Sequence, residues 1–345
     1  MEQQHFDPDG VGVANGAYFG LPFAPDEAEL VLVSVPWDVT VSYGAGTVYA
    51  PDAIIEASTQ LDFCDPMAPG AWRRGIATAD IDYSLQELSQ RLRADAARVI
   101  EQLENGGSPD DEAVVRKLRR VNEGCAMMNA RVEAQVARWL DAGKRVGLVG
   151  GDHSTPYGAI RALGARHAAF GILHVDAHRD LREAYEGFLS SHASIMFNVL
   201  RDVPQVKKLV QVAVRDYSER EAALAEASER IVSFEDFALA EAAFGGATWD
   251  EQCRRIVDAL PEAVYVSFDI DGLSFENCPH TGTPVSGGLS FNQAVWLLRT
   301  LARSGRRIIG FDLVEVCPAT GDRLDAITGA RMLWKLCGAT LSAAK

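Results

Sequence analysis

One stretch of this sequence, residues 170–180, restricts the fold more than any other. Its first half is apolar, and it runs directly into Asp176-Ala177-His178-Arg179-Asp180. A short apolar run bounded by polar residues is typical of a buried strand. Because side chains two positions apart on an extended chain point the same way, Asp176, His178 and Asp180 can converge just beyond the strand end. The stretch therefore predicts a ligand site of the kind that open α/β sheets place at the carboxyl ends of their strands.

Strand and helix patterns alternate along most of the 345 residues. This alternation predicts a mostly parallel sheet covered by helices on both faces, which is a three-layer α/β sandwich. No repeat or shift in composition marks a boundary, so we expect a single domain over 1–345. The expected strands lie near 29–35, 144–149, 170–176, 207–214, 230–233, 263–269 and 307–313, and the expected helices near 51–60, 85–103, 112–142 and 323–337.

Two more of the expected strands end in acidic or imidazole groups. Asp152 and His153 follow the strand at 144–149, and Asp269 and Asp271 close the strand at 263–269. Taken alone, either pair is compatible with a turn that an aspartate caps. Asp269 and Asp271, together with Asp176 and Asp180, bring four carboxylates to one edge of the sheet, which is unfavourable in a buried site unless cations neutralise them.

The combined set contains six potential metal ligands. Two imidazoles and four carboxylates suit Mn²⁺ or Ni²⁺ better than a structural zinc ion. Six side chains exceed the needs of one open metal site, so we expect two ions with shared carboxylates and a bridging water activated as the nucleophile. The alternative is an acid-lined cleft without metal. The predicted ligands are His153, Asp176, His178, Asp180, Asp269 and Asp271.

Charge and composition narrow the classes of partner. The formal net charge is −15, which argues against nucleic acid or an anionic membrane as a partner and favours a cationic substrate. The six cysteines are scattered without a C-x-x-C pair, so neither a structural zinc site nor a disulfide framework is expected. Residues 1–16 lack the basic and apolar regions of a signal peptide, and we expect a cytoplasmic enzyme.

The motifs resemble those of one known family. Gly150–Ser154, Asp176–Asp180 and Ser267–Asp271 match, in order and spacing, the three signatures of the ureohydrolase (arginase and agmatinase) family. The resemblance continues through residues 281–284 and 287–289 to Asp312–Glu315. It implies an arginase-like fold from about residue 30 onward, with an N-terminal extension over about 1–28 and a helical insertion over about 85–142. It also implies a homo-oligomer, a trimer or hexamer, and leaves open a hetero-oligomer with a paralogous subunit.

The resemblance also implies roles for the ligands. Asp176 and Asp269 would bridge two divalent ions, Mn²⁺ or Ni²⁺. His153 and Asp180 would complete one metal site, and His178 and Asp271 the other.

Two further residues receive roles by the same resemblance. Glu315 would accept the substrate guanidinium, and His192 would transfer a proton to the leaving amine and contact the substrate. With Asp180 they make up the expected catalytic set. A histidine at a helix start without a chemical role is the alternative for His192.

The substrate is less constrained than the reaction. Tyr43–Thr47, Ser191–Ser194 and Gly329–Leu333 resemble a branch that contains guanidine hydrolases and relatives acting on methylated biguanides such as metformin. This implies a small cationic guanidino substrate, with Thr47 and Tyr43 closing its pocket. The family's usual Asp-Pro after the third signature is replaced by Ser274-Phe275, beside the expected entrance. Agmatine or a guanidino acid is the second choice of substrate, and arginine is the least expected.

Two readings from other classes remain open at this point. Deacetylases share the fold, but they predict a single metal and fewer carboxylate ligands than the six counted here. A non-catalytic partner subunit of a hetero-oligomeric ureohydrolase predicts a lost ligand, and none is missing from the three motifs.

Overall fold

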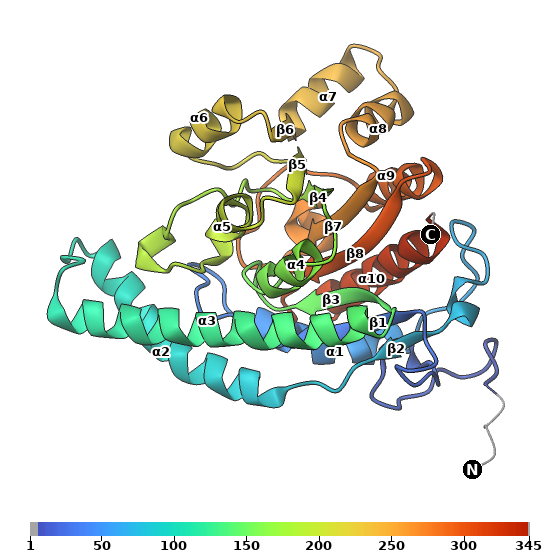
Figure 1. Ribbon diagram of the computed structural model, residues 1–345, viewed down its shortest axis with the longest axis horizontal. Helices are drawn as coiled ribbons and strands as arrows, with labels where there is room; N and C mark the ends of the chain where they lie inside the picture. Colours follow the sequence, from blue (N-terminus) through green and yellow to red (C-terminus); the bar gives the residue numbers. More distant parts are fainter. Residues whose placement is uncertain (1–5, 344–345) are drawn as a thin grey trace.

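The computed structural model describes residues 6–343 and has an eight-stranded sheet at its centre (Figure 1). All seven strand pairings are parallel, in the order β2-β1-β3-β8-β7-β4-β5-β6. The last strand of the chain, β8, therefore lies between β3 and β7. The strands are β1 (Leu30–Val35), β2 (Ile76–Thr78), β3 (Arg145–Gly150), β4 (Phe170–Val175), β5 (Val206–Val212), β6 (Ile231–Phe234), β7 (Ala263–Asp269) and β8 (Arg307–Val314).

Helices cover both faces of this sheet, as the burial of its strands requires. Alternate residues of β1 point into two different hydrophobic cores, one on each face of the sheet. Leu30 and Leu32 belong to the core beneath α1, α8, α9 and α10, whereas Val31 and Val33 belong to the core beneath α2, α3 and α4. Since both faces are buried, the strands are apolar almost throughout. The helices are α1 (Ala50–Ser58), α2 (Tyr83–Glu104), α3 (Glu112–Asp141), α4 (Tyr157–Gly164), α5 (Ile195–Asp202), α6 (Glu219–Ala227), α7 (Asp236–Phe244), α8 (Trp249–Asp258), α9 (Phe291–Arg303) and α10 (Leu324–Ser342).

The predicted fold class, a single-domain α/β sandwich, is confirmed. Every predicted strand and helix is present with bounds close to those expected, and the last helix runs five residues beyond the predicted 337. The sequence did not reveal β2, because a three-residue edge strand is too short to show alternation.

The long antiparallel pair α2 and α3 extends along one side of the molecule (Figure 1). Its apolar stripe packs on the sheet through Leu92, Val99, Val121 and Val132. The description of 85–142 as an insertion, and of 1–28 as an extension, stays a prediction; residues 1–5 of that extension lie outside the described residues.

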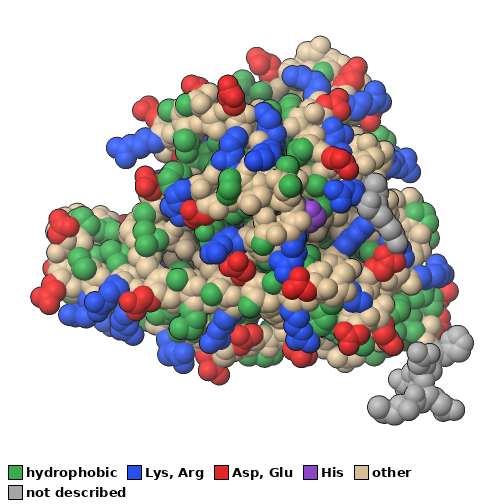
Figure 2. Space-filling model, in the orientation of Figure 1, with side chains coloured by type: hydrophobic (Ala, Val, Ile, Leu, Met, Phe, Trp, Pro, Cys, Tyr) green, Lys and Arg blue, Asp and Glu red, His purple; other side chains and the backbone are tan. Residues whose placement is uncertain are grey.

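The surface is mixed in charge. On the face drawn in Figure 2, acidic and basic side chains are interspersed over the helices. Within residues 6–343, no helix is both long enough and apolar enough to cross a bilayer.

Candidate metal centre

The six predicted ligands come together at the carboxyl ends of β3, β4 and β7. His153 follows β3, the 176–180 motif follows β4, and Asp269 and Asp271 stand at the end of β7. The sheet order places β8 between β3 and β7, so Glu315, which follows β8, faces the same point. The convergence expected from strand ends is therefore present in the fold.

A glycine makes the turn after β3 possible. The amide of Gly151 donates to Val35 O at 3.0 Å, and that of Asp152 donates to Trp37 O at 2.8 Å. A Cβ on Gly151 would lie 1.9 Å from Trp37 O, which no side chain can tolerate. The missing Cβ lets the chain pass this backbone closely and carries His153 into the centre.

The first ligand cluster forms around one nitrogen of His153. Its Nδ1 lies 3.0 Å from Asp176 Oδ2, 3.1 Å from Asp180 Oδ2 and 3.1 Å from Asp269 Oδ2. All four side chains are buried, and Nδ1 has no hydrogen-bond partner of good geometry. Three carboxylate oxygens around an imidazole nitrogen form the donor set that a divalent cation requires.

The other nitrogen of His153 explains why Nδ1 must carry a cation. Ser267 Oγ donates its hydrogen to Asp312 Oδ1 at 3.1 Å, so His153 Nε2, 2.9 Å from Ser267 Oγ, is the donor in their contact. This leaves a lone pair on Nδ1 that faces acceptor oxygens. Only a proton or a metal ion satisfies that arrangement, and the residues present therefore fit a metal site.

The second cluster lies beside the first and shares one carboxylate with it. His178 Nδ1 is 3.1 Å from Asp271 Oδ2 and 3.4 Å from Asp176 Oδ1. Asp176 thus approaches both histidines with its two oxygens, and its Oδ1 also accepts from the His178 amide at 2.6 Å. Asp269 contacts His153 through Oδ2, and its Oδ1 accepts from the Asp271 amide at 2.8 Å. The bridging roles of Asp176 and Asp269 stay predictions.

Behind Asp176 lies a histidine that the sequence did not single out. His174 Nε2 donates to Asp176 Oδ2 at 2.7 Å, and its Nδ1 accepts from Gln211 Nε2 at 3.1 Å. Such outer partners fix the direction of a ligating carboxylate. The only sequence signal was position: His174 is two residues before Asp176, on the same side of β4.

The electrostatics of the clusters show how strongly they favour cations. Burial raises the pKa of Asp269 well above its usual range, and the neighbouring carboxylates of Asp271 and Asp176 raise it further. Burial by itself lowers the pKa of His153, but the carboxylates close to its Nδ1 raise it well above its usual value. These carboxylates ionise together only when positive charge is supplied.

Removal of metal should therefore weaken the fold. We expect a chelator to lower the melting temperature by about 5 °C or more, because an ion that binds only the folded chain stabilises it by about 3 kcal/mol at a hundred times its dissociation constant. Scanning calorimetry before and after dialysis against chelator measures the change, and Mn²⁺ or Ni²⁺ should reverse it. An unchanged melting temperature after complete removal of bound ions would contradict the metal assignment.

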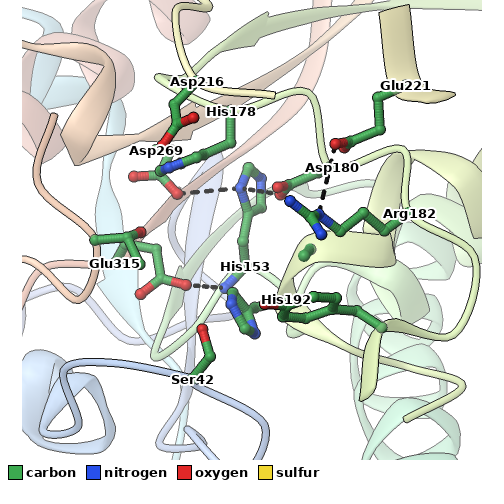
Figure 3. A pocket seen from close by; sticks show the side chains of 13 residues that line it. Ser42, His153, His178, Asp180, Arg182, His192, Asp216, Glu221, Asp269 and Glu315 are labelled. Atoms are coloured by element: carbon green, nitrogen blue, oxygen red, sulfur yellow. Dashed lines mark hydrogen bonds and ion pairs between the residues drawn. The ribbon is translucent and has the colours of Figure 1, made fainter. Parts of the chain in front are cut away.

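A cavity of about 180 Å³ opens above the clusters (Figure 3). Glu315 lies on its wall with Oε1 accepting from the His153 amide at 2.8 Å. Asp180 and Glu315 have backbone φ values of 55° and 61°, and such left-handed conformations of non-glycine residues are concentrated at functional sites. The lining residues are Ser42, His153, His178, Asp180, Arg182, Tyr185, His192, Ala193, Asp216, Glu221, Asp269, Thr283 and Glu315.

His192 also faces this cavity, at the start of the short 3-10 turn that precedes α5. Its amide donates to Thr40 Oγ1 at 3.2 Å, and its ring packs edge-on against Tyr185. Burial, with a smaller contribution from His178, lowers the pKa of His192 to about 3. The imidazole is therefore neutral at pH 7, with a lone pair that can accept a proton.

Two other predicted substrate contacts do not reach the cavity. Thr47 is buried, with its hydroxyl lacking a partner, and Tyr43 is 84% exposed; neither lines the cavity. Their neighbour Ser42 lines it instead. Ser274 and Phe275, where the sequence departs from the family pattern, are also absent from the lining. The loop predicted to close the pocket therefore lines the cavity through Ser42, the residue before Tyr43.

The cavity wall contains residues that sequence reasoning missed. Arg182, Asp216, Glu221 and Thr283 come from loops and from the start of α6. No strand pattern or motif spacing connects them, because loop conformation alone brings them together.

Comparison with known proteins agrees with this architecture. A model of the arginase family matches residues 28–338. The chain is 30% identical over 322 residues to the N(1)-aminopropylagmatine ureohydrolase of Thermus thermophilus, with 93% of each chain covered. It is 29% identical to the agmatinase of Proteus mirabilis, with 90% of this chain and 88% of that one covered. The solved structure of proclavaminate amidino hydrolase from Streptomyces clavuligerus superposes with a TM-score of 0.72 at 21% identity, covering 95% and 97% of the two chains.

The family model over residues 28–338 and the match to a ureohydrolase over nearly the whole length show that the chain belongs to the arginase family of ureohydrolases. The protein is accordingly a metal-dependent hydrolase that acts on C–N bonds of guanidino compounds.

Proposed function

We propose that this enzyme hydrolyses a small guanidino compound, guanidine or a methylated biguanide such as metformin, with two Mn²⁺ or Ni²⁺ ions. The size of the cavity carries this proposal. Sites for drug-sized ligands usually have about 300–1,000 Å³, whereas the space above the clusters is about 180 Å³. A compound without a long tail suits that space. The products would be urea or guanylurea, together with ammonia or an amine.

In this proposal the two clusters hold the ions. His153 and Asp180 would hold one, His178 and Asp271 the other, and Asp176 and Asp269 both. When bound, the ions would supply positive charge that lowers the pKa of water and stabilises negative charge developing on the substrate.

Glu315 would bind the cationic substrate. Burial, followed by the nearby Asp152, raises the pKa of its carboxyl group well above its usual range. A guanidinium in the cavity would stabilise the ionised form through a charge-assisted pair of hydrogen bonds. The His153 amide already holds one carboxylate oxygen in place at 2.8 Å, so the Glu315 side chain loses little conformational freedom when the substrate binds.

His192 would transfer the proton. A neutral imidazole on the cavity wall can accept a proton at its lone pair and deliver it to the departing nitrogen, which must leave as a neutral amine. The weak contact of its Nδ1 with Ser191 Oγ, at 3.4 Å, leaves the ring to interact with substrate.

A second candidate is hydrolysis of agmatine or a related polyamine guanidine. The two curated relatives described above carry names of that activity and match nearly the whole chain. Guanidino acids belong to the same alternative, because they too carry a tail beyond the guanidino group.

An activity panel separates the candidates. Protein loaded with Mn²⁺ or with Ni²⁺ would be offered guanidine, metformin, agmatine, 4-guanidinobutyrate and arginine, and released urea and amine would be measured. We expect the highest kcat/KM for guanidine or metformin and the lowest for arginine. A kcat/KM for agmatine above those of both small compounds would favour the second candidate.

The panel also tests the alternative that the chain is a non-catalytic subunit of a hetero-oligomer. All six predicted ligands are present, and each of them contacts another ligand within 3.1 Å in the two clusters. Absence of turnover with every compound and both ions would favour a role beside a paralogous subunit. The predicted trimer or hexamer remains a prediction that the mass of the purified assembly would check.

A further inference from the structure

The cavity above the metal centre shares three lining side chains with a second cavity. This outer cavity has about 720 Å³ and extends over the loop at 181–186 and the first turn of α6. Arg182, Tyr185 and Glu221 line both spaces. They therefore form a partition between an inner cavity, large enough for a small compound, and an outer one about four times its volume.

Arg182 is the central part of this partition. Its Nε lies 3.5 Å from Glu221 Oε2, and its guanidinium carbon lies 4.5 Å from the centre of the Tyr185 ring. Figure 3 shows the Arg182 guanidinium group near Asp180 and joined to Glu221 by an ion pair. A substrate tail that extended from the inner into the outer cavity would have to pass this guanidinium, because Arg182 lines both spaces.

Glu221, the second residue of the partition, is held in place by several hydrogen bonds. Glu221 is 4% exposed, and its Oε2 accepts from Ser218 N at 2.9 Å and Ser218 Oγ at 2.8 Å in the capping box of α6. Its Oε1 accepts from the Leu181 amide at 3.1 Å. Glu221 already accepts these hydrogen bonds, and its Oε2 also pairs with Arg182. It therefore has little capacity left to bind a cation from the substrate.

We propose that Arg182 sets the length of substrate that the enzyme accepts, by closing the inner cavity to guanidino compounds that carry a second cation. This inference deepens the proposed function and rests on it. An alkyl tail that ends in an ammonium group would have to displace the Arg182 guanidinium and then lie beside it, and two like charges so close together repel each other. Guanidine or metformin fits inside the partition and meets no such penalty.

The alternative role for Arg182 is to bind an anionic tail. The surroundings do not favour it, because Asp180, Asp216 and Glu221 line the same cavity and would repel a carboxylate. Arg182 is also already paired with Glu221.

The test compares Arg182→Ala with Arg220→Ala. Arg220 lines only the outer cavity, so its replacement removes the same charge without opening the partition. For each protein, kcat/KM is measured with guanidine, methylguanidine, agmatine and 4-guanidinobutyrate. We expect Arg182→Ala to raise the ratio of agmatine to guanidine at least about tenfold, within the range that pocket changes produce. Arg220→Ala should leave this ratio near that of the unaltered enzyme.

Three outcomes decide the proposal. An unchanged agmatine-to-guanidine ratio in Arg182→Ala overturns it, even when the unaltered enzyme hydrolyses guanidine well. A selective loss of 4-guanidinobutyrate turnover in Arg182→Ala also overturns it and assigns the anion-binding role. A raised ratio supports it, even when the unaltered enzyme proves poor with guanidine, a result that would count against the proposed substrate alone. If turnover is too slow to measure, calorimetric affinities of agmatine and guanidine for the metal-loaded proteins supply the same ratio.

Discussion

An Asp176→Asn enzyme should lose metal binding and turnover together. Asp176 is the one carboxylate whose two oxygens reach both histidine clusters, and the amide of asparagine would place a donor where one cluster needs an acceptor. Loss of an outer partner of a metal ligand already costs about 10–100-fold in affinity or activity, so loss of a shared ligand should exceed about a hundredfold in both. Metal content by mass spectrometry and steady-state turnover measure the two effects.

Asp202→Asn is the matched control for this variant. Asp202, at the end of α5, pairs with Arg201 and with Tyr157 of α4, away from the clusters, and the same change there should leave metal content unaltered. Circular dichroism would show that the Asp176→Asn chain is folded. Two bound ions per chain and full activity in that variant would contradict the shared-ligand assignment.

Replacing Glu315 by glutamine is expected to reduce kcat/KM by roughly 10²–10³-fold, the cost of truncating one partner of a buried charge pair. Glutamine keeps the acceptor oxygen that the His153 amide requires, so the local fold should persist. It removes the negative charge that a guanidinium would meet. Steady-state kinetics with the best substrate of the panel, together with unchanged metal content, would assign the loss to substrate binding.

Asp216→Asn provides the comparison for Glu315→Gln. Asp216 lines the same cavity but is exposed, so solvent screens its charge. Its replacement should cost much less. If the two variants lost equal activity, Glu315 would have no special place in recognition of the guanidino group.

Much of the metal centre could be predicted because strand ends are local features of the sequence. Apolar runs that stop shortly before His153, Asp176 and Asp269 mark the ends of three strands, and the carboxyl ends of parallel strands in one sheet lie at the same edge. The family resemblance then supplied roles for these residues and added Glu315 and His192, both of which line the cavity.

The cavity wall could not be predicted in the same way. Arg182 and Tyr185 are placed by a loop in which Ala184 and Glu186 have positive φ values, and nothing in their residue types indicates that conformation. Tyr43 was expected at the pocket because it belongs to a glycine-rich motif, yet the loop turns it to solvent. The edge strand β2 could not be predicted for a related reason, because its three residues form a strand only through their pairing with β1.

The position of β8 has a consequence for how the enzyme matures. The strand that precedes Glu315 is the last to be synthesised, yet it pairs with β3 on one side and β7 on the other. Until it inserts, the strand ends that carry His153 and Asp269 are not held side by side. A nascent chain still lacking residues 307–314 therefore lacks the strand that aligns these ends, and the site is completed only after the other seven strands of the sheet have been made.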